Sequence, residues 1–202
     1  MPRDGTATRE RLLDSAERLV LAKGFSATSV DQILGESGSS KGAFFHHFAS
    51  KQVLAHALVE RWVNGDLATM ESGLAAVDDA ADPVEKLLSF VSHFEQWAES
   101  LVAENTSCLY IFALSERDLL DAETVLEVER GVRGWRQAVS AMLRDAYRHV
   151  GLDHAPDPDD LADHLFVTFE GSFLLCRTLR SPDPMRAQLR IYRQLLSSLL
   201  GA

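Results

Sequence analysis

The chain has 202 residues, of which 46% are apolar and 25% are charged, and its formal net charge is −10. These proportions are typical of a globular protein of one or two domains with a sizeable core. No apolar run approaches the roughly 18 residues of a membrane span, and the N-terminus lacks the apolar core of a secretion signal. Two cysteines, Cys108 and Cys176, do not suggest a disulfide framework. We therefore expect a cytoplasmic protein that does not enter the membrane.

The charge is distributed unevenly along the chain. Residues 1–51 hold seven Lys or Arg against six Asp or Glu, whereas residues 52–202 hold 13 against 24. An acidic surface repels DNA, so any contact with nucleic acid would be restricted to the first 51 residues. The alternative is that the acidic surface only aids solubility.

The first predicted element is an amphipathic helix over residues 8–23, which follows a short tail. Gly24 is expected to end it in the left-handed conformation, and Phe25 to fold back onto a small core. The core predicted for residues 1–51 consists of apolar residues at helical spacing, namely Leu12, Ala16, Leu19, Phe25, Val30, Ile33, Phe44 and Phe48.

Two short helices separated by a glycine are predicted next. Ser29 and Gln32 form the S-x-x-Q pattern of a capping box at the start of the first helix. Gly38 lies where a sharp turn needs a positive φ, and Ser39 and Ser40 offer a second N-cap. Two such helices joined by a turn make a helix-turn-helix.

The exposed side of the second short helix has features that suit DNA. Lys41 adds a positive charge near free N–H groups at the helix start, and the small residues Gly42 and Ala43 allow a close approach to a groove. Lys51, at the start of the following helix, is placed to contact a phosphate. The alternative is that the helix pair is a packing corner of an all-α core.

The first fifty-odd residues resemble the N-terminal domain of TetR-type (tetracycline-repressor-like) transcription regulators. Three positions depart from the usual pattern: Leu34 replaces alanine, Ser39 replaces valine, and Phe45 replaces tyrosine. The phenyl ring of Phe45 cannot donate a hydrogen bond to a phosphate, so we expect it to pack against sugar or a thymine methyl. The matching residues are Leu12, Leu13, Ala16, Leu19, Gly24, Phe25, Thr28, Ser29, Val30, Ile33, Gly38, Ser40, Lys41, Gly42, His47, Phe48, Ser50, Lys51 and Leu54.

With this resemblance, the predicted DNA-binding residues fall into two groups, those that contact base edges and those that contact phosphates. The expected contacts to base edges come from Ser40, Lys41, Gly42, Ala43 and His46. The expected contacts to phosphates come from Thr28, Ser29, His47 and Lys51, with a packing role as the alternative for His47.

The rest of the chain is predicted to be all-α, with no strand pattern. Together with the first three helices these elements make nine, as the resemblance implies, and the boundary between a DNA-binding domain (1–51) and a ligand-binding and dimerisation domain (52–202) falls inside the fourth helix. The further helices are expected over residues 50–76, 84–102, 108–117, 122–150, 158–180 and 185–200.

The resemblance implies that the last two helices pair with those of a second copy as a four-helix bundle. They carry more apolar residues than one helix hairpin needs to cover itself, although sealing the core of the monomer is the alternative. The residues that we assign to a homodimer interface are Leu161, Leu165, Phe169, Phe173, Leu189, Tyr192, Leu196 and Leu199.

Aromatic residues are frequent in the middle helices, where related proteins commonly bind a small inducer. Plain core packing is the alternative reading. We expect an apolar or aromatic ligand, because the candidate pocket residues are mostly apolar. We expect no cofactor, and no metal because the histidines form no metal-binding motif. The residues predicted to bind the ligand are Phe90, Phe94, Trp97, Phe112, Trp135, Phe169 and Phe173.

Cys108 stands at the start of the predicted short helix, where the helix dipole lowers a thiol pKa. The surrounding segment resembles one in a TetR-like subgroup, some members of which sense electrophiles through a cysteine there. Inert packing is the alternative reading for this residue.

The sequence as a whole predicts a ligand-responsive transcriptional regulator. It is expected to act as a repressor that binds a palindromic DNA operator as a homodimer and is released by its inducer. The alternatives are an all-α enzyme that uses the aromatic cavity, or a helical adaptor. Against an enzyme, we find no nucleophile elbow, glycine-rich phosphate loop or carboxylate pair in a convincing context.

Overall fold

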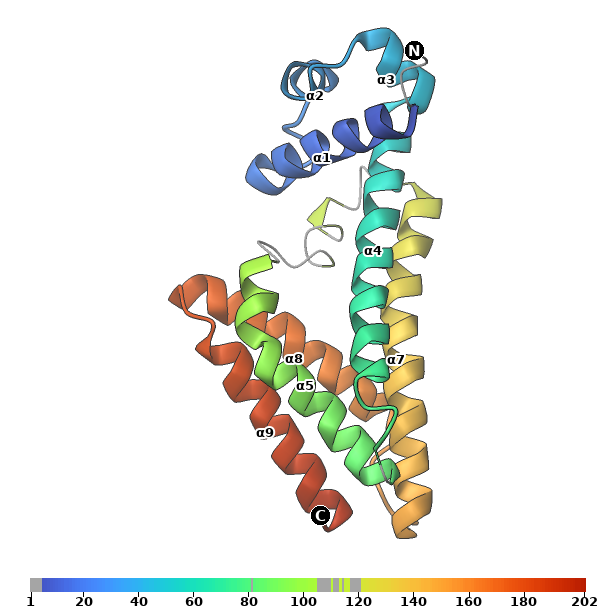
Figure 1. The fold of residues 1–202 in the computed structure, drawn as a ribbon, viewed down its shortest axis with the longest axis vertical. Helices are drawn as coiled ribbons and strands as arrows, with labels where there is room; N and C mark the ends of the chain where they lie inside the picture. The colour runs from blue at the N-terminus through green and yellow to red at the C-terminus, as the bar shows by residue number, and fades with distance from the viewer. Residues whose placement is uncertain (1–4, 81, 105–109, 111–112, 114, 117–120) are drawn as a thin grey trace. The chain divides into compact units, whose positions relative to one another are not determined.

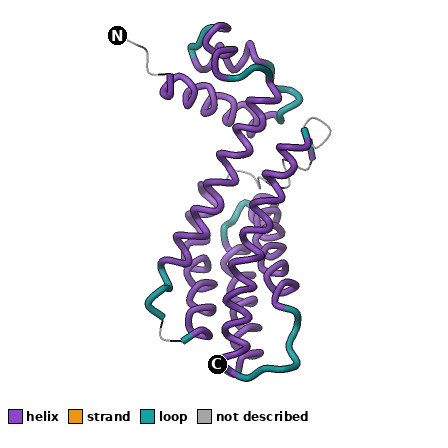
Figure 2. Tube along the Cα trace, turned by 90° about the vertical axis from the view of Figure 1, so that its right-hand side faces the viewer, coloured by secondary structure: helices purple, strands orange, loops and turns teal. Residues whose placement is uncertain are grey.

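The structure is a computed structural model, and it describes all residues except 1–4, 81, 105–109, 111–112, 114 and 117–120. The described residues form eight α-helices and no strand, which confirms the all-α prediction. Figures 1 and 2 show their arrangement. The helices are α1 (Gly5–Lys23), α2 (Val30–Ser37), α3 (Lys41–His47), α4 (Lys51–Ala75), α5 (Pro83–Glu104), α7 (Ala122–Val150), α8 (Pro158–Leu179) and α9 (Asp183–Leu200).

Most helix ends fall where the capping residues predict them. Helix α7 begins at Ala122 and ends at Val150 as expected, whereas α1 begins three residues earlier than predicted, at Gly5. The helix predicted over residues 108–117 lies mainly outside the described residues, as do Cys108 and Phe112. None of the helices in the described part of the chain combines the length and the apolar character needed to cross a membrane.

The chain divides into two compact units. The first, called the head below, comprises residues 1–64 together with 109–129. The second, called the body, comprises residues 65–108 together with 130–202. Helices α4 and α7 each contribute residues to both units, and the head contains the whole predicted DNA-binding domain.

The head has its own apolar core. All eight predicted core residues belong to it, with Leu19 and Val30 half-buried at its edge. The start of α4 contributes Leu54 and Leu58, both almost fully buried. Burying one such side chain stabilises the fold by roughly 1.5–3 kcal/mol, so the helix-turn-helix is held by packing as well as by its caps.

The body is a helical bundle in which α9 packs against both α5 and α8. Polar side chains join these helices at specific points. The hydroxyl of Tyr192 on α9 donates to the carbonyl oxygen of Leu161 on α8 at 2.8 Å. On α5, Glu95 accepts hydrogen bonds from Arg190 and Arg193 of α9, each at 3.0 Å. These contacts fix the packing of the last two helices against α5.

Candidate functional site

The helix-turn-helix has the local geometry that the sequence predicts. The Ser29 hydroxyl accepts from the backbone N–H of Gln32 at 3.2 Å, and the Gln32 side chain accepts from the Ser29 N–H at 2.9 Å, which confirms the capping box. Gly38 ends α2 with a φ of +62°, and Ser40 caps α3 by accepting from the N–H of Ala43 at 3.1 Å. The turn between α2 and α3 is therefore set by residues that the sequence alone singles out.

Helix α3 presents one side to the core and the other to solvent. Phe44 is fully buried, and its ring lies 5.8 Å from that of Phe48, measured between ring centroids. On the other side, 48% of the surface of Phe45 is exposed, which is unusual for a phenylalanine. The exposed predicted DNA-binding residues on this side are Ser40, Lys41, Gly42, Phe45 and His46.

The remaining predicted DNA-binding residues differ in their accessibility. Ser29 is exposed at the start of α2, whereas Ala43 and His47 on α3 are half-buried. Thr28 is only 1% exposed, and its hydroxyl donates to the carbonyl oxygen of Gly24 at 2.9 Å. The structure thus gives Thr28 a contact inside the head, not on its surface.

Lys51 is also engaged within the head. Its ammonium group donates to the carbonyl oxygen of Phe25 at 2.6 Å and lies 4.2 Å from the centroid of the Phe25 ring. Burial lowers the pKa of this ammonium group, and the nearby Glu116 carboxylate partly offsets that effect. Lys51 therefore stabilises the turn between α1 and α2, a role that its position in the sequence does not reveal.

Four of the predicted ligand-binding residues form one aromatic cluster in the body. The ring of Phe94 lies 5.1 Å from Phe90, 5.5 Å from Trp135 and 5.5 Å from Phe169, between centroids. A side chain at Gly73 of α4 would place its Cβ 2.7 Å from the Phe94 ring, so the glycine allows α4 to approach this cluster closely. The rings come from α5, α7 and α8 and pack against one another.

The edge of this cluster is less tightly packed. Trp97 is 37% exposed and Phe173 is half-buried, while Phe112 lies outside the described residues. His93, which no sequence motif indicates, lies 5.8 Å from Trp97 and 5.2 Å from Phe94 between ring centroids. Its Nε2 atom is buried and has no hydrogen-bond partner in the described part of the chain. A buried polar atom of this kind is costly unless something else satisfies it.

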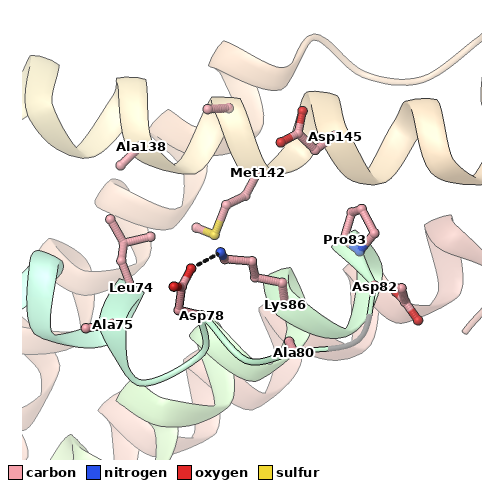
Figure 3. Close-up of a pocket in the computed structure, with 11 residues that line it drawn as sticks. Leu74, Ala75, Asp78, Ala80, Asp82, Pro83, Lys86, Ala138, Met142 and Asp145 are labelled. Atoms are coloured by element: carbon pink, nitrogen blue, oxygen red, sulfur yellow. Dashed lines mark hydrogen bonds and ion pairs between the residues drawn. The ribbon is translucent and has the colours of Figure 1, made fainter.

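A surface groove of about 590 Å³ lies elsewhere in the body, between the end of α4, the start of α5 and the middle of α7 (Figure 3). Leu74 and Met142 give it an apolar lining, and two of its lining residues, Lys86 and Asp78, pair at 2.8 Å. None of the six predicted ligand-binding residues that the structure describes lines this groove. Its position and its charged rim distinguish it from the aromatic cluster.

The predicted dimerisation residues lie mainly inside the body. Five of the eight (Leu165, Phe169, Leu189, Tyr192 and Leu196) are buried, while the other three are half-buried. The spacing of apolar residues had identified a buried face of each helix correctly, but that face packs within the same chain. A different set of apolar side chains on α8 and α9 is exposed, namely Val167, Leu174, Leu175, Leu179, Ile191 and Leu195.

A capped helix-turn-helix with an exposed polar and aromatic face, followed by a helical bundle, defines a class of helical DNA-binding proteins. Comparison with known protein families identifies the particular family. Residues 12–58 match the family model described as bacterial regulatory proteins, tetR family, and residues 83–192 match the tetracyclin repressor-like C-terminal domain. The chain therefore belongs to the tetR family. It is a DNA-binding transcriptional regulator and not an enzyme.

Individual relatives agree with this assignment. The chain is 24% identical to the transcriptional regulator AcuR of Cereibacter sphaeroides, over 94% of this chain and 85% of that protein. It is 23% identical to the HTH-type transcriptional repressor NemR of Escherichia coli K12, over 95% and 94% of the two chains. A crystal structure of a TetR transcriptional regulator from Chloroflexus aurantiacus, 22% identical, superposes with a TM-score of 0.75 over 96% of each chain. That superposition shows a shared fold.

Proposed function

We propose that this regulator is a repressor that binds a palindromic operator as a homodimer and is released by a small, largely apolar or aromatic inducer. The observation that carries the proposal is the exposed side of α3, where Lys41, Phe45 and His46 face solvent at the end of a capped helix-turn-helix. A short helix of this kind reaches base edges in the major groove. The name of the relative NemR, a transcriptional repressor, supports the direction of regulation.

In this proposal the residues of α3 share the recognition of DNA. Base edges are contacted by Ser40, Lys41, Gly42, Ala43 and His46, and phosphates by Ser29 and His47. Phe45 packs against sugar or a thymine methyl, since its ring is exposed and has no polar group. Thr28 and Lys51 act from within the head by holding the turn before α2. A regulator with this role has to work where the chromosome is, so a cytoplasmic location is part of the proposal.

A homodimer is proposed because one α3 helix contacts too few base pairs for a specific site. Two copies related by a two-fold axis would read two half-sites about 34–36 Å apart. The exposed apolar side chains of α8 and α9 supply a surface through which two copies could meet. Leu174 on α8 and Leu195 on α9 are two examples. Such exposed apolar surface is uncommon on a monomer and typical of an interface.

The aromatic cluster is the proposed inducer site. Its rings offer stacking partners for a flat ligand, and the unsatisfied Nε2 atom of His93 offers a hydrogen bond. Because Phe90, Phe94, Trp135 and Phe169 already pack against one another, a ligand has to part them and so favours a second arrangement of α5, α7 and α8. A coupling of about 1–3 kcal/mol between the two sites would weaken DNA binding roughly 5–150-fold.

The proposal is tested by footprinting the full-length protein on DNA flanking its own gene and on sites selected from random DNA. We expect protection of a palindrome, with an affinity that falls steeply as salt rises because phosphate contacts release counterions. Weak, sequence-independent binding in both experiments would contradict the proposal.

The variant Lys41→Ala tests the assignment of the reading face. It should weaken operator binding because a contact to a base edge is lost. Since the variant also removes a positive charge from the interface with DNA, it should reduce the slope of log K against log salt by up to about 0.9. Lys23→Ala is the matched control, because Lys23 is an exposed lysine of the same head, in the last turn of α1. Wild-type affinity and slope for Lys41→Ala would contradict the place of Lys41 on the reading face.

A further inference from the structure

The turn between α1 and α2 is held by a residue far away in the sequence. The carboxylate of Glu116 accepts hydrogen bonds from the backbone N–H of Phe25 at 3.1 Å and from that of Ser26 at 3.2 Å. It also accepts from the hydroxyl of Ser26. Opposite it, Lys51 donates to the carbonyl oxygen of Phe25. One peptide segment is therefore gripped by a carboxylate at its N–H groups and by an ammonium group at its carbonyl.

The local backbone is built to admit this carboxylate. Gly24 has a φ of +90°, and a Cβ at that position would lie 2.7 Å from the Oε1 atom of Glu116. The glycine thus serves both the turn and the approach of Glu116. On the other side of the segment, the N–H of Thr28 donates to the carbonyl oxygen of Phe25 at 3.1 Å. The next residue, Ser29, caps α2, so the gripped segment fixes the point where the helix-turn-helix begins.

We propose that Glu116 is a positioning residue for DNA binding, which sets the entry of the chain into α2 and hence the orientation of the reading helix α3. The inference rests on the proposed DNA-binding function and adds a residue that lies outside the helix-turn-helix. Glu116 is in the connection between α5 and α7. Those two helices carry Phe90, Phe94 and Trp135 of the aromatic cluster. In the sequence, Glu116 therefore lies between two helices of the proposed inducer site.

A carboxylate is needed at this position because all three partners are donors. Hydrogen bonds to a charged acceptor are roughly twice as strong as neutral ones. In Glu116→Gln, one of the two side-chain oxygens becomes an NH₂ group, which would face N–H or O–H donors and lose those bonds. The substitution keeps size and shape, so it removes the grip without creating a cavity.

The first test is operator binding by the full-length Glu116→Gln variant. We expect affinity to fall about tenfold or more, as for the loss of a hydrogen bond to a charged group, while the salt slope stays that of the wild type because no phosphate contact is lost. Glu60→Gln is the control, since Glu60 is an exposed glutamate on α4 in the same unit. Wild-type affinity in Glu116→Gln would overturn the inference.

The second test needs no DNA and separates this inference from the proposed function. Amide hydrogen exchange, measured by NMR on the full chain, should accelerate at Phe25 and Ser26 in Glu116→Gln. The Gly24 amide, which donates to the Val20 carbonyl oxygen at 2.8 Å, should keep its protection. Faster exchange throughout the head would show a general loss of stability and would overturn the positioning role. Failure of the wild type to bind any operator would refute the proposed function alone.

Discussion

The head and the body treat their large apolar side chains differently. In the described residues, three such side chains are exposed in the head, whereas eight are exposed in the body. Six of those eight lie on α8 and α9. The head closes its core and leaves mostly polar groups at its surface, which suits the reading of base edges by hydrogen bonds. The body leaves an apolar surface open, which suits another protein surface.

The ion pairs do not follow this division. In the head, Arg61 of α4 contacts Asp14 at 2.7 Å and Glu10 at 3.5 Å and also pairs with Glu17, so one arginine joins α4 to three acidic residues of α1. In the body, Arg136 of α7 and Asp163 of α8 form a two-bond pair at 2.6 Å. Both units thus use arginine pairs to fix helices, and they differ in what they leave uncovered.

The largest expected effect on assembly concerns the exposed apolar surface of the body. Leu174→Glu places a charge on that surface and should weaken dimerisation by about 30-fold or more, which is the loss typical of an interface hot spot. The mass of the protein in solution, measured by sedimentation velocity, should move toward that of the monomer.

Leu126→Glu is the matched control for this prediction. Leu126 lies on α7 in the head and is 61% exposed, against 60% for Leu174. If both variants sediment as the wild type does, the α8–α9 surface is not where two copies meet. If both dissociate, exposure alone does not distinguish the body from the head.

A pair of neighbouring phenylalanines tests the two sides of α3. Phe44 is fully buried, and Phe44→Ala should lower the free energy of unfolding by about 3–5 kcal/mol. Phe45 is half exposed, and Phe45→Ala should change stability by less than about 0.5 kcal/mol while weakening operator binding. Urea unfolding followed by circular dichroism measures the first quantity, and a binding titration the second. Equal destabilisation by the two variants would contradict the assignment of faces.

Local signals explain why so much of the head was predictable. The capping box of Ser29 and Gln32 and the positive φ of Gly38 depend on residues a few positions apart, so the sequence reveals them directly. The same holds for the N-cap at Ser40 and for the apolar periodicity that placed Phe44 in the core. Helix positions in the body followed from similar spacing.

Contacts between distant segments were not predictable. Glu116 lies 90 residues from Ser26, and no local pattern indicates that their side chains meet. The position of Lys51 at the start of a helix predicts a contact to a DNA phosphate, yet its ammonium group donates a hydrogen bond to the carbonyl oxygen of Phe25. On α8 and α9, periodicity separates apolar from polar positions but does not say which apolar face packs inward. The sequence therefore does not reveal that Leu165 is buried within the chain while Leu174 is exposed, and Leu174 is the residue that our proposal uses.

The smallest expected effect concerns the ion pairs that join α5 to α9. The Glu95 side chain is 12% exposed and is paired with Arg190 and Arg193, whereas Glu99, one turn further along α5, is 75% exposed and pairs with Arg186 at 3.7 Å. Glu95→Gln should lower the free energy of unfolding by about 1–3 kcal/mol. Glu99→Gln, the matched control, should lower it by less than about 1 kcal/mol, since exposed pairs contribute little.

The dependence on pH separates the charge of Glu95 from its packing. Burial opposes ionisation of this carboxyl, but its hydrogen bonds to the two arginines outweigh that effect and hold its pKa below the ordinary value. The contribution is therefore complete above the unfolded pKa of about 4.3 and is lost as the pH falls through the lower pKa of the folded state. Urea midpoints of wild type and Glu95→Gln should differ at neutral pH and converge in acid. A constant difference would mean that the ionised carboxylate of Glu95 does not stabilise the contact between α5 and α9.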